Sequence, residues 1–285
     1  MIQSMTGYGK AEIQLPTKKV TVEIKSLNSK NIDLNVRIPS YYKEKELIMR
    51  QKIAKSLVRG KVDFSIYVEN IGSTASSALN TEVIEAYMKQ LESISEASKL
   101  ELLQMAVRLP DSVQTVREDI DESEWTQIDA AIDEVLKKIG IYRADEGAAL
   151  QEDFEKRITI LKEKLEEVIQ IDPLRVEEVK SRLNKSIEDI QAKVDENRFE
   201  QELIYYIEKL DITEEKVRLK NHLDYFLKEL ESNQSNGKKL GFITQEIGRE
   251  INTIGSKSNF APMQKVVVQM KDELEKIKEQ NLNVL

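Results

Sequence analysis

Residues 240–254 read Leu-Gly-Phe-Ile-Thr-Gln-Glu-Ile-Gly-Arg-Glu-Ile-Asn-Thr-Ile, and their apolar side chains recur at helical spacing. With successive residues placed about 100° apart, the large aliphatic side chains fall within about 80° of arc. They are Leu240, Ile243, Ile247, Ile251 and Ile254. This stripe predicts an amphipathic helix over Lys239–Ile254 with one face packed into a core.

The polar side of this helix carries residue types suited to phosphate chemistry. Glu246 and Glu250 are four positions apart, so their carboxylates are neighbours on one face. A divalent cation such as Mg²⁺ or Mn²⁺ takes carboxylate oxygens of this kind, and Arg249 beside them suits a phosphate. Two glutamates at this spacing are also common on helices, so a surface ion-pair set is the alternative interpretation.

We expect the helix to end at Gly255, followed by the turn Ser256-Lys257-Ser258-Asn259. Hydroxyl, amide and ammonium groups before a helix N-terminus are suited to an anion. A capping loop that binds nothing is the alternative.

His222 is the only histidine in the chain. It lies at the edge of an apolar helical stripe that runs from Leu219 to Leu230, where an imidazole could ligate a metal or carry a proton. A packed or solvated histidine is the alternative. Glu202 and Asp211 supply further carboxylates upstream.

The N-terminal part of the chain reads as strands with one helix. Period-two alternation predicts strands within 1–14 and at 20–27, 32–38 and 62–68. The turn cluster Asn28-Ser-Lys-Asn predicts that 20–27 and 32–38 form a hairpin. A helix between Pro39 and Gly60 is expected to cover one face of an antiparallel sheet.

Beyond a small, polar linker at 71–78 the sequence reads as helices. The expected helices are 81–98, 125–138 ending at Gly140, 143–170, 173–194, 198–209, 213–230, 239–254 and one from Ala261 onward. Asp172-Pro173 is expected to split the two long charged helices, which would form a hairpin arm.

The predicted fold class is therefore α+β. An N-terminal sheet domain (1–70) precedes a helical middle region with the arm (71–196) and a C-terminal helical domain (197–285).

The composition excludes several classes of site. Cysteine is absent, which rules out disulfides, zinc–thiolate centres and cysteine nucleophiles. A single histidine rules out zinc sites that need two or three. The opening Met1-Ile-Gln-Ser-Met lacks the regions of a signal peptide, and the apolar runs are short, so we expect a cytoplasmic protein.

The net charge of −8 is unevenly distributed along the chain. Residues 1–70 hold 13 Lys/Arg and 7 Asp/Glu, a balance of +6, whereas the rest holds 30 and 44, a balance of −14. Basic turns that include Lys25, Lys30, Arg59 and Lys61 could hold a sugar-phosphate backbone without reading sequence. The alternative is that these charges only solubilise the protein.

Several motifs resemble, in order along the chain, those of the YicC/YloC family of bacterial endoribonucleases. They are Met5-Thr-Gly-Tyr-Gly, Leu27-Asn-Ser-Lys-Asn-Ile-Asp, Arg59-Gly-Lys-Val, Arg143-Ala-Asp-Glu-Gly and Arg218-Leu-Lys-Asn-His-Leu. The strongest likeness runs from Gly237 to Gln280 and contains the block Q-E-x-x-R-E-x-N-T-x-x-S-K-S at 245–258.

This resemblance implies an endoribonuclease that depends on a divalent cation and assembles as a hexamer enclosing its RNA. On that basis we expect Glu246 and Glu250, with Glu202 or Asp211, to hold Mn²⁺ or Mg²⁺. Arg249 and Lys257 would stabilise charge on the phosphate, and His222 would be a metal ligand or proton carrier. Further RNA contacts are expected from Asn252, Ser256, Lys25, Lys30, Arg59 and Lys61.

Two other functions remain open on the sequence. In one, the RNA 2′-OH is the nucleophile and His222 the general base, without a metal in the chemistry. In the other, the protein is a non-catalytic adaptor that presents RNA to another nuclease.

Overall fold

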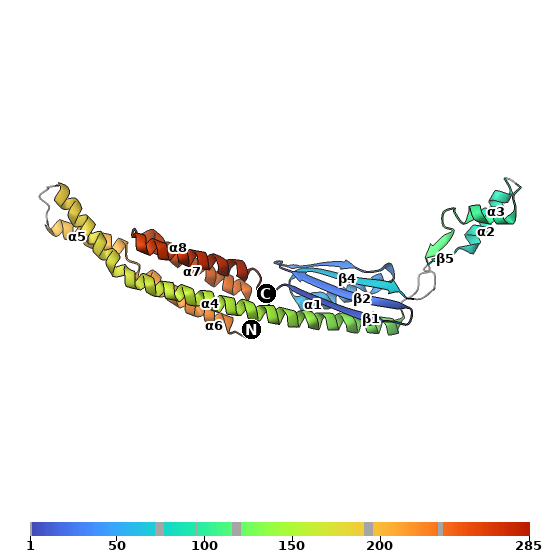
Figure 1. The fold of residues 1–285 in the computed structure, drawn as a ribbon, viewed down its shortest axis with the longest axis horizontal. Coiled ribbons are helices and arrows are strands. Elements are labelled where there is room, and N and C mark those ends of the chain that lie inside the picture. The colour runs from blue at the N-terminus through green and yellow to red at the C-terminus, as the bar shows by residue number, and fades with distance from the viewer. Residues whose placement is uncertain (1, 72–76, 95, 116–120, 191–195, 233–235) are drawn as a thin grey trace.

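The computed structural model describes residues 2–71, 77–94, 96–115, 121–190, 196–232 and 236–285. The molecule is a rod whose spine is one helix, α4 (Glu122–Ile190), and the other elements are attached along it (Figure 1). At 1.5 Å per residue this 69-residue helix is roughly 100 Å long. No helix in these ranges has both the length and the apolar content to cross a membrane.

A four-stranded mixed sheet lies along the first part of α4. Its order is β1 (Gly7–Gln14), β2 (Lys18–Leu27), β4 (Gly60–Asn70) and β3 (Ile32–Arg37). The α+β class is confirmed, but the predicted hairpin is wrong, because β4 lies between β2 and β3 and pairs parallel with β3. The physical reason is that β4 buries a row of large apolar side chains and therefore occupies the centre, which leaves the more exposed β3 at the edge.

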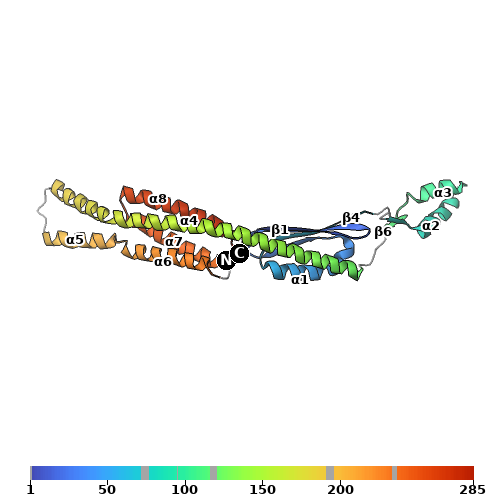
Figure 2. The same cartoon turned by 60° about the horizontal axis from the view of Figure 1, so that its bottom comes forward.

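The first core lies between one face of this sheet and two helices. A 3₁₀ helix (Ser40–Lys45) leads into α1 (Glu46–Leu57), and α1 and α4 cover the same face, as Figure 2 shows. The buried side chains come from β2, β4, α1 and α4 and include Val22, Ile24, Phe64, Met49, Ile53, Ile132 and Ile139. The covering helix is confirmed, and the other face of the sheet carries no helix among the described residues.

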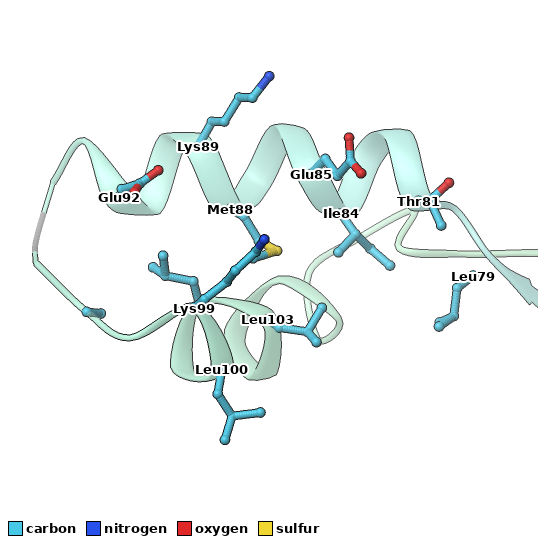
Figure 3. A pocket seen from close by; sticks show the side chains of 12 residues that line it. Leu79, Thr81, Ile84, Glu85, Met88, Lys89, Glu92, Lys99, Leu100 and Leu103 are labelled. Atoms are coloured by element: carbon cyan, nitrogen blue, oxygen red, sulfur yellow. The ribbon is translucent and has the colours of Figure 1, made fainter.

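A small module projects from the far end of the sheet. It contains β5 (Ser77–Leu79), α2 (Thr81–Glu92), α3 (Lys99–Ala106) and β6 (Val113–Thr115). Ile84 and Met88 of α2 point toward α3 and line an apolar hollow (Figure 3). Most of the predicted linker at 71–78 lies outside the described residues.

The breaks predicted at Gly140 and at Asp172-Pro173 are wrong, because α4 passes through both positions. A proline inside a helix costs about 3 kcal/mol, but packing on both sides of it offsets that cost. The Asp172 carboxylate also binds Arg175 at 2.7 Å and Lys216 at 2.8 Å next to the proline. The arm is therefore the end of α4 together with α5 (Glu196–Lys209), opposite the module (Figure 1).

The second core is built from α6 (Thr213–Leu230), α7 (Gly237–Lys257) and α8 (Ala261–Asn281) packed on the second part of α4. All five aliphatic residues of the predicted stripe on α7 are buried there. The α7 helix begins after Asn236, whose side chain accepts a hydrogen bond from the Lys239 amide, and it ends two residues later than predicted.

A junction of buried hydrogen bonds joins the two cores. The Arg143 guanidinium is 3% exposed and donates to the carbonyls of Met5 and Leu57 and to the Ser26 hydroxyl. Burial lowers the pKa of this guanidinium. The segments at the two termini pair beside it through a bridge between Ser4 and Val284.

Replacing Arg143 with Leu should lower the free energy of unfolding by about 3 kcal/mol, because buried acceptors then lose their donor. Urea titration followed by circular dichroism measures the change. Arg182→Leu, on an exposed position of the same helix, is the control and should change stability by less than about 0.5 kcal/mol. Equal effects of the two substitutions would contradict the role of the junction.

Candidate functional site

Two ion pairs fix how α6 and α7 lie against each other. The Lys239 ammonium contacts the Glu229 carboxylate at 2.6 Å near one end, and Lys257 contacts Glu215 at 2.8 Å near the other. The residue numbers rise along one helix as they fall along the other, so the helices are antiparallel. We call this contact line the α6–α7 seam.

The register of the seam places His222 opposite two carboxylates. His222 is seven residues from both Glu215 and Glu229, so it shares their side of α6. Glu246 follows Lys239 by seven residues, and Glu250 precedes Lys257 by seven. Because seven residues make nearly two helical turns, this register places His222 level with the part of α7 between Glu246 and Glu250.

The Glu250 carboxylate is the unusual group in this set. Glu250 is 4% exposed, yet no hydrogen bond or ion pair joins its side chain to any residue in the described ranges. The carboxylate oxygens themselves keep contact with solvent, so water, a cation or another ligand can reach them at the edge of the seam. Glu246 and His222 beside it are half-buried and likewise have no described partner.

These residues fit a divalent cation only in part. Among the described residues, no group of three or more His, Asp or Glu is arranged to hold a metal ion. Magnesium, however, is commonly bound by one or two carboxylates together with water and substrate phosphate. The unpartnered Glu250 carboxylate next to Glu246 has the donor chemistry for that mode of binding.

A second set of predicted residues lies on the neighbouring side of α7. Arg249, Asn252 and Ser256 line a surface hollow between α7 and α8. Its other lining residues are Gln245, Gly248, Thr253 and Lys278. No lining residue is acidic, and the Arg249 guanidinium has no described partner, so this α7–α8 hollow is suited to an anion.

The turn predicted at 256–259 is only partly present, because Ser256 and Lys257 belong to α7. The Gln264 side chain donates to the carbonyls of Gly255 and Ser258 and so satisfies the end of the helix. The Lys257 ammonium donates to the Glu215 carboxylate and to the Asp211 carbonyl. It therefore links α7 to α6 and the residues before it.

The structure does not bring Asp211 and Glu202 beside Glu246. The Asp211 carboxylate accepts hydrogen bonds from the Thr213 hydroxyl and amide at the start of α6, and these bonds lower its pKa. Asp211 lies beside Lys257, which is about 16 Å along α7 from Glu246. Glu202 is exposed on α5, further toward the arm.

The predicted basic residues of the N-terminal part have different surroundings. Arg59 donates to the Val284 carbonyl and belongs to the junction. Lys25 on β2 contacts Glu23 at 2.9 Å and lies over the Tyr8 ring. Lys30 and Lys61 are exposed without a described partner. All four lie with the first core, apart from the seam in the second.

Sequence reasoning missed Gln245 and Lys278 in the hollow. Lys278 is distant from Arg249 in sequence, and only the antiparallel pairing of α7 with α8 brings them together. The short connection between these two helices was the signal that could have placed them.

Comparisons with known proteins cover almost all of the chain. Residues 2–152 match the family described as Endoribonuclease YicC-like, N-terminal region, and residues 168–285 match Endoribonuclease YicC-like, C-terminal. A probable endoribonuclease YicC from Clostridioides difficile (strain 630) is 32% identical over 293 residues, covering 100% of both chains. A probable endoribonuclease YicC from Haemophilus influenzae is 29% identical over 287 residues, again covering 100% of both.

Replacing Glu250 with Gln should change the free energy of unfolding by less than about 0.5 kcal/mol in EDTA, because the carboxylate keeps contact with solvent and has no described partner to lose. Urea unfolding at neutral pH measures it. Glu202→Gln, at an exposed position, is the control and should change stability by less than about 0.5 kcal/mol. A Glu250→Gln protein less stable than wild type would show that the carboxylate has a stabilising partner.

Proposed function

This chain belongs to the YicC-like endoribonuclease family, and we propose that it cleaves RNA phosphodiester bonds at the α6–α7 seam. The observation that carries the proposal is the pair Glu246 and Glu250 on the seam side of α7, level with the only histidine. Neither carboxylate has a partner among the described residues, so both are open to a ligand.

Glu246 and Glu250 would hold Mn²⁺ or Mg²⁺, with water and an RNA phosphate as the remaining ligands. When bound there, the cation would polarise the phosphate and lower the pKa of a bound water. The proposal needs no carboxylate from Asp211 or Glu202, because substrate oxygens complete the coordination.

The α7–α8 hollow would hold the strand next to the scissile bond. Arg249 is adjacent to Glu250 in sequence, so a phosphate bound by its guanidinium lies within one helical turn of the seam. Asn252, Ser256 and Lys278 supply further donors in the hollow. These contacts position the RNA backbone and are independent of base sequence.

His222 would move a proton at a reacting oxygen. Its imidazole is half-buried and has no hydrogen-bond partner among the described residues, so it is free to contact a substrate oxygen. The same feature favours the second mechanism, in which His222 deprotonates the RNA 2′-OH and no metal takes part. The two mechanisms predict different product ends.

We also keep a homo-oligomer, a hexamer on the family resemblance, as a proposal. Its support is the amount of apolar surface left exposed on the module, where Ile94, Leu100 and Met105 are exposed. Mass measurement by light scattering tests it, and a monomer at micromolar concentration would contradict it.

Glu250→Gln and His222→Ala should each lower the cleavage rate of a single-stranded RNA by at least about 100-fold. Affinity for RNA should stay within about twofold, because the α7–α8 hollow remains intact. Glu166→Gln, exposed on α4, is the matched control and should cut at the wild-type rate. Glu250→Gln protein that cuts as fast as wild type would place the site elsewhere and favour the adaptor function.

Metal binding can also be tested without an activity assay. Millimolar Mn²⁺ should raise the unfolding temperature of the wild type and leave that of Glu250→Gln unchanged, because only the native site binds the ion. Cleavage that persists fully in EDTA and yields 2′,3′-cyclic phosphate ends would exclude the metal mechanism and support the 2′-OH mechanism.

A further inference from the structure

The sheet face opposite α1 and α4 is open, and Figure 1 views it directly. Strand alternation places every second residue of β1, β2, β4 and β3 on this open face. The strand pairing sets Tyr8 beside Lys25, Lys25 beside Asp63, and Asp63 beside Asn35. The open face is therefore a continuous polar surface four strands wide.

Two tyrosines stand on this surface. Tyr8 on β1 is 45% exposed and Tyr67 on β4 is 54% exposed. Thr21, a small side chain, is the strand partner of Tyr67, so no bulky neighbour on β2 stands beside that ring. Tyr8 and Tyr67 are two strands and four residues apart in register, a separation of about 16 Å.

The cations around these rings are positioned for phosphate. The Lys25 ammonium lies 5.6 Å from the centre of the Tyr8 ring. Arg37 lines a hollow of the open face together with Lys25 and Tyr67, and its guanidinium has no partner in the described part of the chain. Lys61 is exposed on β4, where its strand partners are Leu27 on β2 and Asp33 on β3.

The open face also carries carboxylates, which reduce its electrostatic attraction for polyanions. Glu23 contacts Lys25, Asp63 accepts a hydrogen bond from Asn35, and Glu12 contacts Lys10 and Lys19. Pairing with these lysines lowers the pKa of Glu12 to about 2, so it stays ionised. A surface of balanced charge with exposed aromatic rings is better suited to stacking than to unselective binding of any nucleic acid.

We propose that the open face binds single-stranded RNA, with unpaired bases stacked on Tyr8 and Tyr67. Lys25 and Arg37 contact phosphates between the rows of the two rings, and Lys61 contacts a phosphate on the far side of the Tyr8 row. Duplex RNA conceals its base faces, so this surface selects single strands by stacking. The proposal rests on the proposed function only for the choice of RNA as ligand, because the open face lies in the first core and the seam in the second.

The test is a binding titration in EDTA with the full chain. The probes are a fluorescein-labelled single-stranded RNA without self-complementarity and a blunt duplex of the same sequence. Tyr8→Ala/Tyr67→Ala should weaken binding of the single strand by at least about tenfold and change duplex binding by less than about twofold. Tyr8→Phe/Tyr67→Phe should restore single-strand affinity, since the phenyl ring still stacks.

Tyr142→Ala/Tyr205→Ala is the matched control, because both rings are similarly exposed but lie on α4 and α5. It should bind both probes as the wild type does. Unchanged single-strand affinity of the Tyr8/Tyr67 alanine variant, or equal loss for both probes, would overturn the proposal.

A measurement on the wild-type chain covers the case in which the alanine variant fails to fold. Photo-crosslinking to a 5-bromouridine single strand should map to Tyr8 or Tyr67, and crosslinks confined to the second core would overturn the proposal. Failure of the proposed function gives a different result from failure of this proposal. In that case the Glu250→Gln protein still cleaves RNA, whatever the open face binds.

Discussion

The helix α4 belongs to both hydrophobic cores, and every other part of the rod is placed by its packing on that helix. Its first part buries Ile132 and Ile139 against the sheet, and its second part buries Phe154 and Leu161 against α6–α8. Apolar burial of this kind contributes about 25 cal/mol per Å², enough to carry the helix past Gly140 and Pro173. Between the two cores, Arg143 closes the junction with buried hydrogen bonds.

The same packing determines which charged side chains lie at the seam. The second core buries the aliphatic stripe of α7, which forces the adjacent side of that helix against α6. Ion pairs at the two ends of the seam neutralise Glu215 and Glu229, whereas Glu246 and Glu250 in the middle pair with no lysine in the described part of the chain. The middle of the seam is therefore left with negative charge and one imidazole, which suits a cation or a phosphate transfer.

Local patterns in the sequence predicted much of this fold and supplied the residues of the candidate site. The stripe of α7 and the alternation of β2 and β4 are visible because burial imposes a period on each element. The position of β3 at the sheet edge and the continuity of α4 were not predictable from local sequence. Packing against distant residues decides both, in spite of the turn signal at Asn28–Asn31 and the helix-breaking signal at Pro173. Glu246, Glu250 and His222 were predicted as site residues from residue type, and they stay a prediction; their shared level depends on helix register. The sequence did not single out Tyr8 and Tyr67, because only strand pairing puts them on one face.

The claim that His222 and Glu250 act together across the seam is tested most directly by a double-mutant cycle on kcat/KM for RNA cleavage. If the two residues serve one reaction step, adding Glu250→Gln to the His222→Ala protein should lower kcat/KM by less than about tenfold further. Losses that multiply, with each substitution lowering kcat/KM by its full factor in both backgrounds, would show independent action and contradict a shared site at the seam.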